Sequence, residues 1–206
     1  MHPENLLSSA TRIPVLESGL TTVTSAEIAK DDSKQLAALA FALAEKPRSS
    51  LQELAKAVGV SKATLYRFCN TREELVERLL KHGIAVTSEI IRSAKLNELP
   101  PLEGLRLMTQ NSLENREITA FLMYHWTPDS ESGKAVEAEW DAALDAFFLR
   151  GQQEGVFRID IPAPALTEIW VALLLGLVDA ERRGRVARAA LPDLLEVMFL
   201  QGVGKQ

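Results

Sequence analysis

Apolar residues recur along most of this chain with the spacing of amphipathic helices. Between residues 36 and 44, leucine and alanine occupy the i, i+3, i+4, i+7 and i+8 positions of one helix face, and Pro47 ends the pattern. After Pro100-Pro101, further helical patterns cover about residues 101–113, 115–126, 133–154, 164–183 and 191–203. Alternating apolar and polar runs bounded by turn pairs are missing, so the sequence predicts no strand.

Polar residues with capping chemistry mark the helix starts that follow Pro47. Ser50-x-x-Glu53 is a capping box, which predicts the start of a second helix. Ser61 can cap a third helix that runs to about residue 69, and a second capping box, Thr71-x-x-Glu74, opens a longer fourth helix. We therefore expect an all-α protein of about nine helices, in which a three-helix N-terminal head joins a larger C-terminal helical bundle.

Charge is distributed unevenly over three parts of the chain. Residues 1–32, which mix Ser, Thr, Pro and Gly, carry a net charge of −3, and we expect a poorly ordered arm with a short helix near its end. Residues 33–81 carry +4 and residues 82–206 carry −6, within a total of −5. Phosphate attraction requires a local basic patch rather than a basic protein, so the total charge does not exclude nucleic acid as a partner.

The stretch from residue 51 to residue 70, LQELAKAVGVSKATLYRFCN, has the pattern of a helix-turn-helix. Ala55 is small, as a tight helix crossing requires, and Gly59 suits a sharp turn with positive φ. Leu65 follows that glycine by six residues, the spacing expected when the second helix packs back on the first. The outward face carries donors and an aromatic, where a recognition helix meets base edges and phosphates. The alternative is a helical hairpin in an ordinary bundle.

The same residues resemble a known family. GVSKATLYRF followed by NTREELVERLL looks like the DNA-binding domain of the tetracycline-repressor (TetR) family. RGQQEGVFRID, at 150–160, and the apolar run LLLGL, at 173–177, are similar to the end of the family's ligand-binding domain. The chain departs from the family in a shorter turn at 47–49, in Cys69-Asn70 where an aromatic and often proline are common, and in its long arm. The resemblance implies a DNA-binding domain at 33–80 and a ligand-binding and dimerisation domain at 81–206.

The resemblance also implies which residues contact DNA. They are Ser50, Ser61, Lys62, Ala63, Thr64, Tyr66, Arg67 and Arg72. Tyr66 would contact a phosphate through its hydroxyl, and Arg67 would pair with guanine or clamp a phosphate. Ser50 and Arg72, at the starts of flanking helices, would hold the DNA backbone. The alternatives are that Tyr66 packs on the head and that Arg72 is a solvated charge at a helix end.

The last two helical patterns predict an interface between two subunits. The helix at about 164–183 is apolar nearly all round, so it must be buried on two sides. Ala172, Gly176 and Ala180 form a stripe of small residues that permits close helix approach, and Leu195 and Phe199 would complete the interface. The resemblance agrees, because the family's dimers form a four-helix bundle from these elements. The alternative is a single buried core helix.

Aromatic residues concentrate in the body, which holds all three tryptophans. Given the family, we expect an inducer pocket lined by Met108, Phe121, Tyr124, His125, Trp126, Trp140, Phe147 and Trp170. His125 would supply a polar anchor in that pocket. For any one of these residues, simple core packing is the alternative.

Other chemistries find little support. The three histidines, at 2, 82 and 125, lack metal-ligand spacing, Cys69 is the one cysteine, and no glycine-rich phosphate loop follows a strand. We therefore expect no enzyme, no cofactor and no metal site. The longest apolar run, 169–178, is shorter than a membrane span, and the N-terminus lacks the pattern of a signal peptide, so we expect a cytoplasmic protein without a membrane partner.

Together these patterns predict a transcriptional regulator, a homodimeric repressor that binds a palindromic operator in double-stranded DNA and is released by a small, largely apolar effector. The alternative is a helical ligand-binding or scaffold protein whose head has lost specific DNA binding, because the acidic arm could screen the head. The salt dependence of DNA binding separates the two hypotheses.

Overall fold

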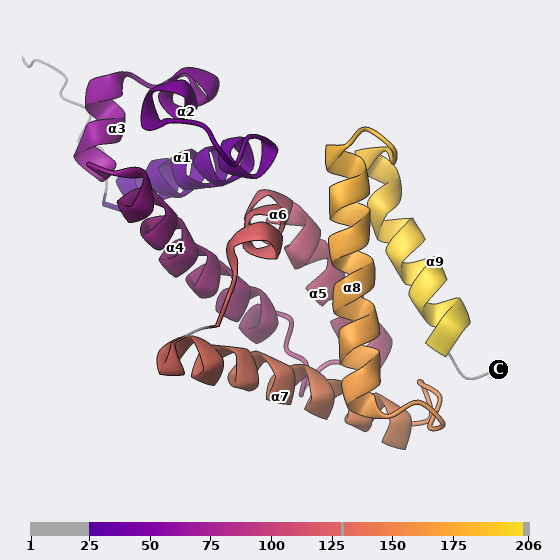
Figure 1. The fold of residues 1–206 in the computed structure, drawn as a ribbon. Helices are drawn as coiled ribbons and strands as arrows, with labels where there is room; N and C mark the ends of the chain where they lie inside the picture. The colour runs from indigo at the N-terminus through magenta and orange to yellow at the C-terminus, as the bar shows by residue number, and fades with distance from the viewer. Residues whose placement is uncertain (1–24, 129, 204–206) are drawn as a thin grey trace, which may run out of the picture.

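The computed structural model describes residues 25–128 and 130–203, whose regular structure is helical throughout (Figure 1). These residues form nine α-helices and one short 3₁₀ helix, and they contain no β-strand. In chain order the elements are α1 (Ser25–Glu45), α2 (Leu51–Val58), α3 (Lys62–Phe68), α4 (Arg72–Ser93), α5 (Pro101–Glu114), α6 (Arg116–His125), α7 (Glu131–Gln153), α8 (Ala163–Arg182), η1 (Arg188–Ala190) and α9 (Leu191–Val203). The all-α class predicted from the sequence is confirmed.

The helix starts in the head use the polar residues that the sequence indicated. The Ser50 hydroxyl accepts the backbone N–H of Glu53, and the Glu53 carboxylate accepts the N–H of Ser50 at 2.8 Å, so this capping box is present. At α4, the Thr71 hydroxyl accepts the N–H of Glu74 at 3.1 Å. The Glu74 carboxylate accepts the N–H of Asn70 instead of the N–H of Thr71. The second predicted capping box therefore has its Thr71 bond but not the reciprocal bond to the Thr71 backbone.

The first helix begins earlier than the sequence pattern suggested. Because α1 starts at Ser25, residues 25–32 are helical, as expected near the end of the arm, but this helix is continuous with the first helix of the head. The remainder of the predicted arm, residues 1–24, lies outside the described residues. Figure 1 shows α1, α2 and α3 grouped at one end of the molecule, with α4 running from this head into the body and α8 and α9 lying side by side.

The hydrophobic core of the head includes two residues of the body. Six leucines from α1 to α4 are at most 2% exposed in this core: Leu39, Leu43, Leu54, Leu65, Leu75 and Leu79. Ile118 and Phe121 of α6 belong to the same cluster, and they are 2% and 0% exposed. Helix α6 therefore packs against α1 as part of the head core, and the predicted boundary near residue 80 divides one continuous core.

A polar network ties the end of α1 to the body. Arg182, near the end of α8, pairs with Glu45 at 2.9 Å and with Asp179 at 2.7 Å, and the Arg182 side chain is 16% exposed. The Tyr124 hydroxyl donates to the Asp179 carboxylate at 2.8 Å. Hydrogen bonds from Arg182 and Tyr124 hold the pKa of Asp179 below its usual value, so the carboxylate stays ionised. The network joins α1, α6 and α8.

Helix α8 is long and apolar enough, by length and composition alone, to cross a membrane. Its uninterrupted apolar run, 169–178, is shorter than the helix. In the structure α8 packs against α6, α7 and α9, as a core helix of a bundle does. Only 33% of this apolar stretch is buried, and Ile169, Ala172 and Gly176 on it are exposed.

We predict that Phe121→Ala lowers the free energy of unfolding by about 3–5 kcal/mol, because it leaves a cavity in the shared core. Phe41→Ala is the matched control, since Phe41 of α1 is 40% exposed and its loss should cost at most about 1 kcal/mol. Urea unfolding measures both. Equal costs would mean that α6 does not complete the head core.

Candidate nucleic-acid interface and the cavity of the body

The α2–turn–α3 unit has the geometry that its sequence pattern predicted. Gly59 adopts a left-handed conformation with φ of 76°, which ends α2 without steric cost. The next N–H, that of Val60, donates to the carbonyl of Ala55 at 3.0 Å. Ala55 and Leu65 are 3% and 1% exposed, so α3 packs back on α2. This is the arrangement of a helix-turn-helix, with α3 as the recognition helix.

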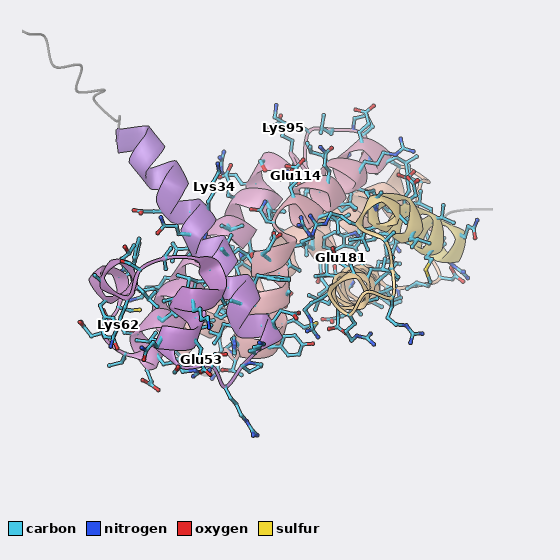
Figure 2. The ribbon with its side chains drawn as sticks, turned by 90° about the horizontal axis from the view of Figure 1, so that it is seen from above. Lys34, Glu53, Lys62, Lys95, Glu114 and Glu181 are labelled. Atoms are coloured by element: carbon cyan, nitrogen blue, oxygen red, sulfur yellow. The ribbon has the colours of Figure 1, made fainter. Side chains whose placement is uncertain are left out.

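The outer face of α3 presents polar side chains to solvent. Ser61 caps α3, and its hydroxyl accepts the Thr64 N–H at 3.0 Å and is 2.8 Å from the Thr64 hydroxyl. Lys62 and Ala63 are exposed, and Tyr66 is 42% exposed, with the Lys62 ammonium 5.4 Å from its ring centroid. Figure 2 places Lys62 on the head, away from the body helices. The Arg67 side chain is not among those described.

Ser50 and Arg72 are engaged within the head. The Ser50 hydroxyl donates to the Glu53 carboxylate at 2.8 Å in the capping box. The Arg72 guanidinium donates to the carbonyl of Pro47, which joins the start of α4 to the turn between α1 and α2. Both residues therefore stabilise the elements that flank α3, whether or not they also contact the DNA backbone.

A cavity of about 500 Å³ lies in the body, between helices α4, α5, α6, α7 and α8. Its volume falls in the range of sites for small organic ligands. Met108, Trp126, Trp140 and Trp170, which the sequence analysis proposed for an inducer pocket, line this cavity.

The other proposed pocket residues lie elsewhere. Phe121 and Phe147 are fully buried in the head core and in the body core. Tyr124 is 45% exposed and bonded to Asp179, and the His125 ring lies against Phe121 with centroids 4.6 Å apart. The reason is the rotation of α6: residues 119, 122 and 126 line the cavity, whereas the next stripe, 118, 121 and 125, turns toward the head.

The cavity also holds three carboxylates that the sequence analysis missed. Glu137 and Asp141 of α7 and Glu168 of α8 line it, and among the described residues no lysine, arginine or histidine does. The pocket residues predicted from the sequence were aromatic residues, a histidine and a methionine, so no carboxylate was among them. The i, i+4 spacing of Glu137 and Asp141 around Trp140 is the signal that could have found them.

The outer face of α8 carries the predicted small-residue stripe. Ala172 and Gly176 are exposed, Ala180 is half-buried, and a Cβ added to Gly176 would meet no atom within 4 Å. Ile169 of the same helix is 42% exposed. This side of the helix is open to a partner.

The predicted α9 contribution to an interface needs correction. Leu195 and Phe199 are 0% and 1% exposed in the body core and cannot reach a partner. With Leu191 they form the i, i+4, i+8 stripe that α9 turns inward, whereas Val197 and Met198 are 48% and 56% exposed.

In the described residues, no group of three or more His, Cys, Asp or Glu side chains could hold a metal ion.

These features define the class of the protein: a helix-turn-helix DNA-binding head on a helical body with a ligand-sized cavity. No protein-family model matches the chain. The chain is 48% identical over 174 residues to the HTH-type transcriptional regulator NfxB of Pseudomonas aeruginosa. This alignment covers 83% of this chain and 93% of NfxB. It is 23% identical over 168 residues to the HTH-type transcriptional repressor LfrR of Mycolicibacterium smegmatis, in an alignment that covers 82% of this chain and 87% of LfrR.

Solved structures show the same fold. The TetR-like regulator LfrR from Mycobacterium smegmatis, in complex with proflavine, has a TM-score of 0.60 at 22% identity and covers 86% of this chain and 99% of that one. The ketosteroid transcriptional regulator KstR2 of Mycobacterium tuberculosis has a TM-score of 0.63 at 18% identity, and the match covers 85% of this chain and 96% of that one. The chain belongs to the TetR family of transcriptional regulators; it is a DNA-binding regulator and not an enzyme.

The pH dependence of stability should report the half-buried His125. Burial, and then the nearby Arg72 charge, lower the pKa of His125, and its Nε2 is buried without a hydrogen bond. As pH falls below the ordinary histidine value of about 6.5, the unfolded chain takes up the proton first, so folding stability falls. We predict that His125→Leu loses less Tm between pH 7.5 and 5.5 than the parent protein. An identical loss in both would contradict the burial of this imidazole; His82, which is half-buried, titrates in the same sense in both proteins.

Proposed function

We propose that this regulator is a cytoplasmic homodimeric repressor that binds a palindromic operator through α3 and is released when a small, largely apolar molecule enters the body cavity. The observation that carries the DNA-binding part is the exposed polar face of α3 on a packed helix-turn-helix. Lys62 and Tyr66 project from this face, and neither is needed to fill the head core. Their exposure favours DNA contact over the alternative that Tyr66 packs on the head.

The effector part of the proposal rests on the cavity and on its neighbours. Helix α8 lines the cavity and also carries Arg182, which pairs with Glu45 at the end of α1. Helix α6 lines the cavity and fills the head core. A ligand that favours a different position of these helices would shift the population toward dimers whose heads no longer match the operator. The complex of LfrR with proflavine supports a small-molecule effector.

The dimer part rests on the apolar outer face of α8 and α9. Ile169, Val197 and Met198 are exposed on these two helices, and Ala172 and Gly176 permit close approach of a second copy. A two-fold pairing through this face would hold two recognition helices about one DNA turn apart, roughly 34–36 Å.

We predict that Lys62→Ala and Tyr66→Ala each weaken operator binding about five- to tenfold, because each removes a phosphate contact, while Tm stays nearly unchanged. Lys62→Ala should also reduce, by about one, the slope with which the logarithm of the binding constant falls with the logarithm of salt concentration. Fluorescence anisotropy of a labelled operator duplex at several salt concentrations measures both effects. Lys134→Ala, in the body, is the control for the lost charge.

If the Lys62 and Tyr66 variants bind DNA as the parent does, α3 does not read the operator. If the parent protein itself shows no salt-dependent DNA binding, the chain is instead a helical ligand-binding or scaffold protein whose head has lost specific DNA binding.

We predict that Gly176→Leu converts the dimer to a folded monomer, because the new side chain separates the two α8 helices. The subunit itself should not lose stability, since the site is open and leucine favours helix more than glycine does. Light scattering after size-exclusion chromatography gives the mass, with Ala138→Leu on the exposed side of α7 as control. A Gly176→Leu protein that keeps the dimer mass would place the interface elsewhere.

A further inference from the structure

The recognition helix α3 is too short to be stable without support from the rest of the head. It has seven residues, Lys62–Phe68, whereas an isolated helix needs about 12–15 residues to form in water. Its closest helix neighbour is α2, and Leu65, 1% exposed, anchors its inner face. The direction in which α3 points therefore depends strongly on how its two ends are held.

The two ends of α3 are held in different ways. At its start, the Ser61 hydroxyl caps the helix by accepting the N–H of Thr64 at 3.0 Å. At its end, the chain leaves α3 through Cys69 in an extended conformation, with φ of −158° and ψ of 144°. A left-handed residue commonly closes a helix, as Gly59 closes α2, but Cys69 does not adopt that conformation. The last carbonyl of α3 therefore takes its donor from another helix.

Two side chains of α4 bind the backbone on either side of Cys69. The Arg78 guanidinium donates to the carbonyl of Phe68, the last residue of α3. One turn earlier on α4, the Glu74 carboxylate accepts the N–H of Asn70 at 2.8 Å. Because residues four apart lie on one face of a helix, this face of α4 holds both the end of α3 and the chain that follows it.

Arg78 makes a second contact with the same residue of α3. Its guanidinium carbon lies 5.7 Å from the centroid of the Phe68 ring, within the range of a cation–π interaction. A cation at this end of a helix also interacts favourably with the helix dipole. The guanidinium is therefore engaged with α3 in the DNA-free protein.

We propose that Arg78 is a positioning residue for operator binding: it closes the C-terminal end of α3 and so fixes the direction in which α3 presents Lys62 and Tyr66 to DNA. The proposal rests on the proposed function, in which α3 reads the operator. It adds a residue that acts through the recognition helix and not through a contact of its own with DNA. Hydrogen bonds from charged groups are stronger than those between neutral groups, so the loss of this one should loosen the end of α3.

Cys69, the one cysteine of the chain, can report whether this helix end is closed. It is 1% exposed, and burial, and then Glu74, raise the pKa of its thiol, whereas Arg78 lowers it. A buried thiol with a raised pKa reacts slowly with a disulfide reagent until the structure around it opens. Removal of the Arg78 charge would by itself raise the pKa further and slow the reaction. A faster reaction in an Arg78 variant therefore reports opening of the helix end.

The test compares Arg78→Ala with Lys81→Ala in the full chain. Lys81 is an exposed cation on the same helix and pairs with Glu77 at 2.7 Å, so its loss removes the same charge. In Arg78→Ala, Cys69 should react with dithiobis(nitrobenzoate) at least about fivefold faster than in the parent, because a charged hydrogen bond is lost. In Lys81→Ala the rate should stay within about twofold of the parent, because an exposed ion pair contributes little. The Tm of both variants should fall by at most about 4 °C.

The same variants are titrated with two duplexes of equal length, one enriched by selection from a random library and one unrelated to it. Arg78→Ala should weaken binding of the enriched duplex about five- to tenfold and of the unrelated duplex by at most about twofold, because non-specific binding depends chiefly on charge. Lys81→Ala should stay within about twofold of the parent for both duplexes. Arg78→Lys should restore part of the loss, because lysine keeps the charge and a donor but cannot stack a planar group on Phe68.

The outcomes separate this role from others that Arg78 could have. An unchanged thiol rate in Arg78→Ala would show that Arg78 does not hold α3. A faster thiol reaction with unchanged affinity for the enriched duplex would leave Arg78 as a helix cap without a positioning role. Equal weakening for both duplexes, fully restored by Arg78→Lys, would mean a direct phosphate contact. Each of these results overturns the proposal.

Failure of the proposed function would look different. If the parent protein bound neither duplex, operator recognition by α3 would be wrong, and the positioning role of Arg78 in DNA binding would be wrong with it. The thiol rate does not involve DNA, so it would still decide whether Arg78 closes the end of α3.

Discussion

Helix α6 is buried on two sides, and the rest of the structure depends on this constraint. One stripe, with Ile118 and Phe121, completes the core of the DNA-binding head, and the adjacent stripe, with Thr119, Leu122 and Trp126, forms a wall of the body cavity. Close-packed interiors do not absorb displacements gradually, so a change on one side of α6 must be accommodated on the other. The fold thereby places the cavity and the core of the DNA-binding head on neighbouring sides of one helix.

Helix α8 couples the same two regions by a different physical interaction. Its inner side lines the cavity, its exposed side carries Ala172 and Gly176, and its end carries Arg182, which holds Glu45 of α1 and Asp179 in a half-buried network. Such a network is sensitive to geometry, because a charge that loses its partner while buried is costly. In the proposed dimer, α8 would set the spacing of the two heads, so a ligand that favours another position of α8 would alter operator fit.

Local signals in the sequence predicted the elements well, and tertiary packing decided what they could not predict. The box at Ser50, the caps at Ser61 and Thr71 and the glycine turn at Gly59 act within a few residues, and the structure contains each of them. The phase of a helix about its axis depends on its neighbours, so Phe121 was assigned to the pocket and Phe199 to the interface, although both are buried in cores. The cavity carboxylates were missed because acidic residues on a helix usually face open solvent, and only the fold shows that Glu137, Asp141 and Glu168 lie at the rim of one cavity.

The selection of bound sequences from a random duplex library, at about physiological salt, tests the central claim most directly. The account predicts enrichment of a palindrome whose two half-sites are about one helical turn apart, because a two-fold dimer presents two copies of α3. No enrichment from a folded, dimeric preparation would contradict operator recognition by α3, and the cavity of the body would then be the basis of a ligand-binding function without specific DNA.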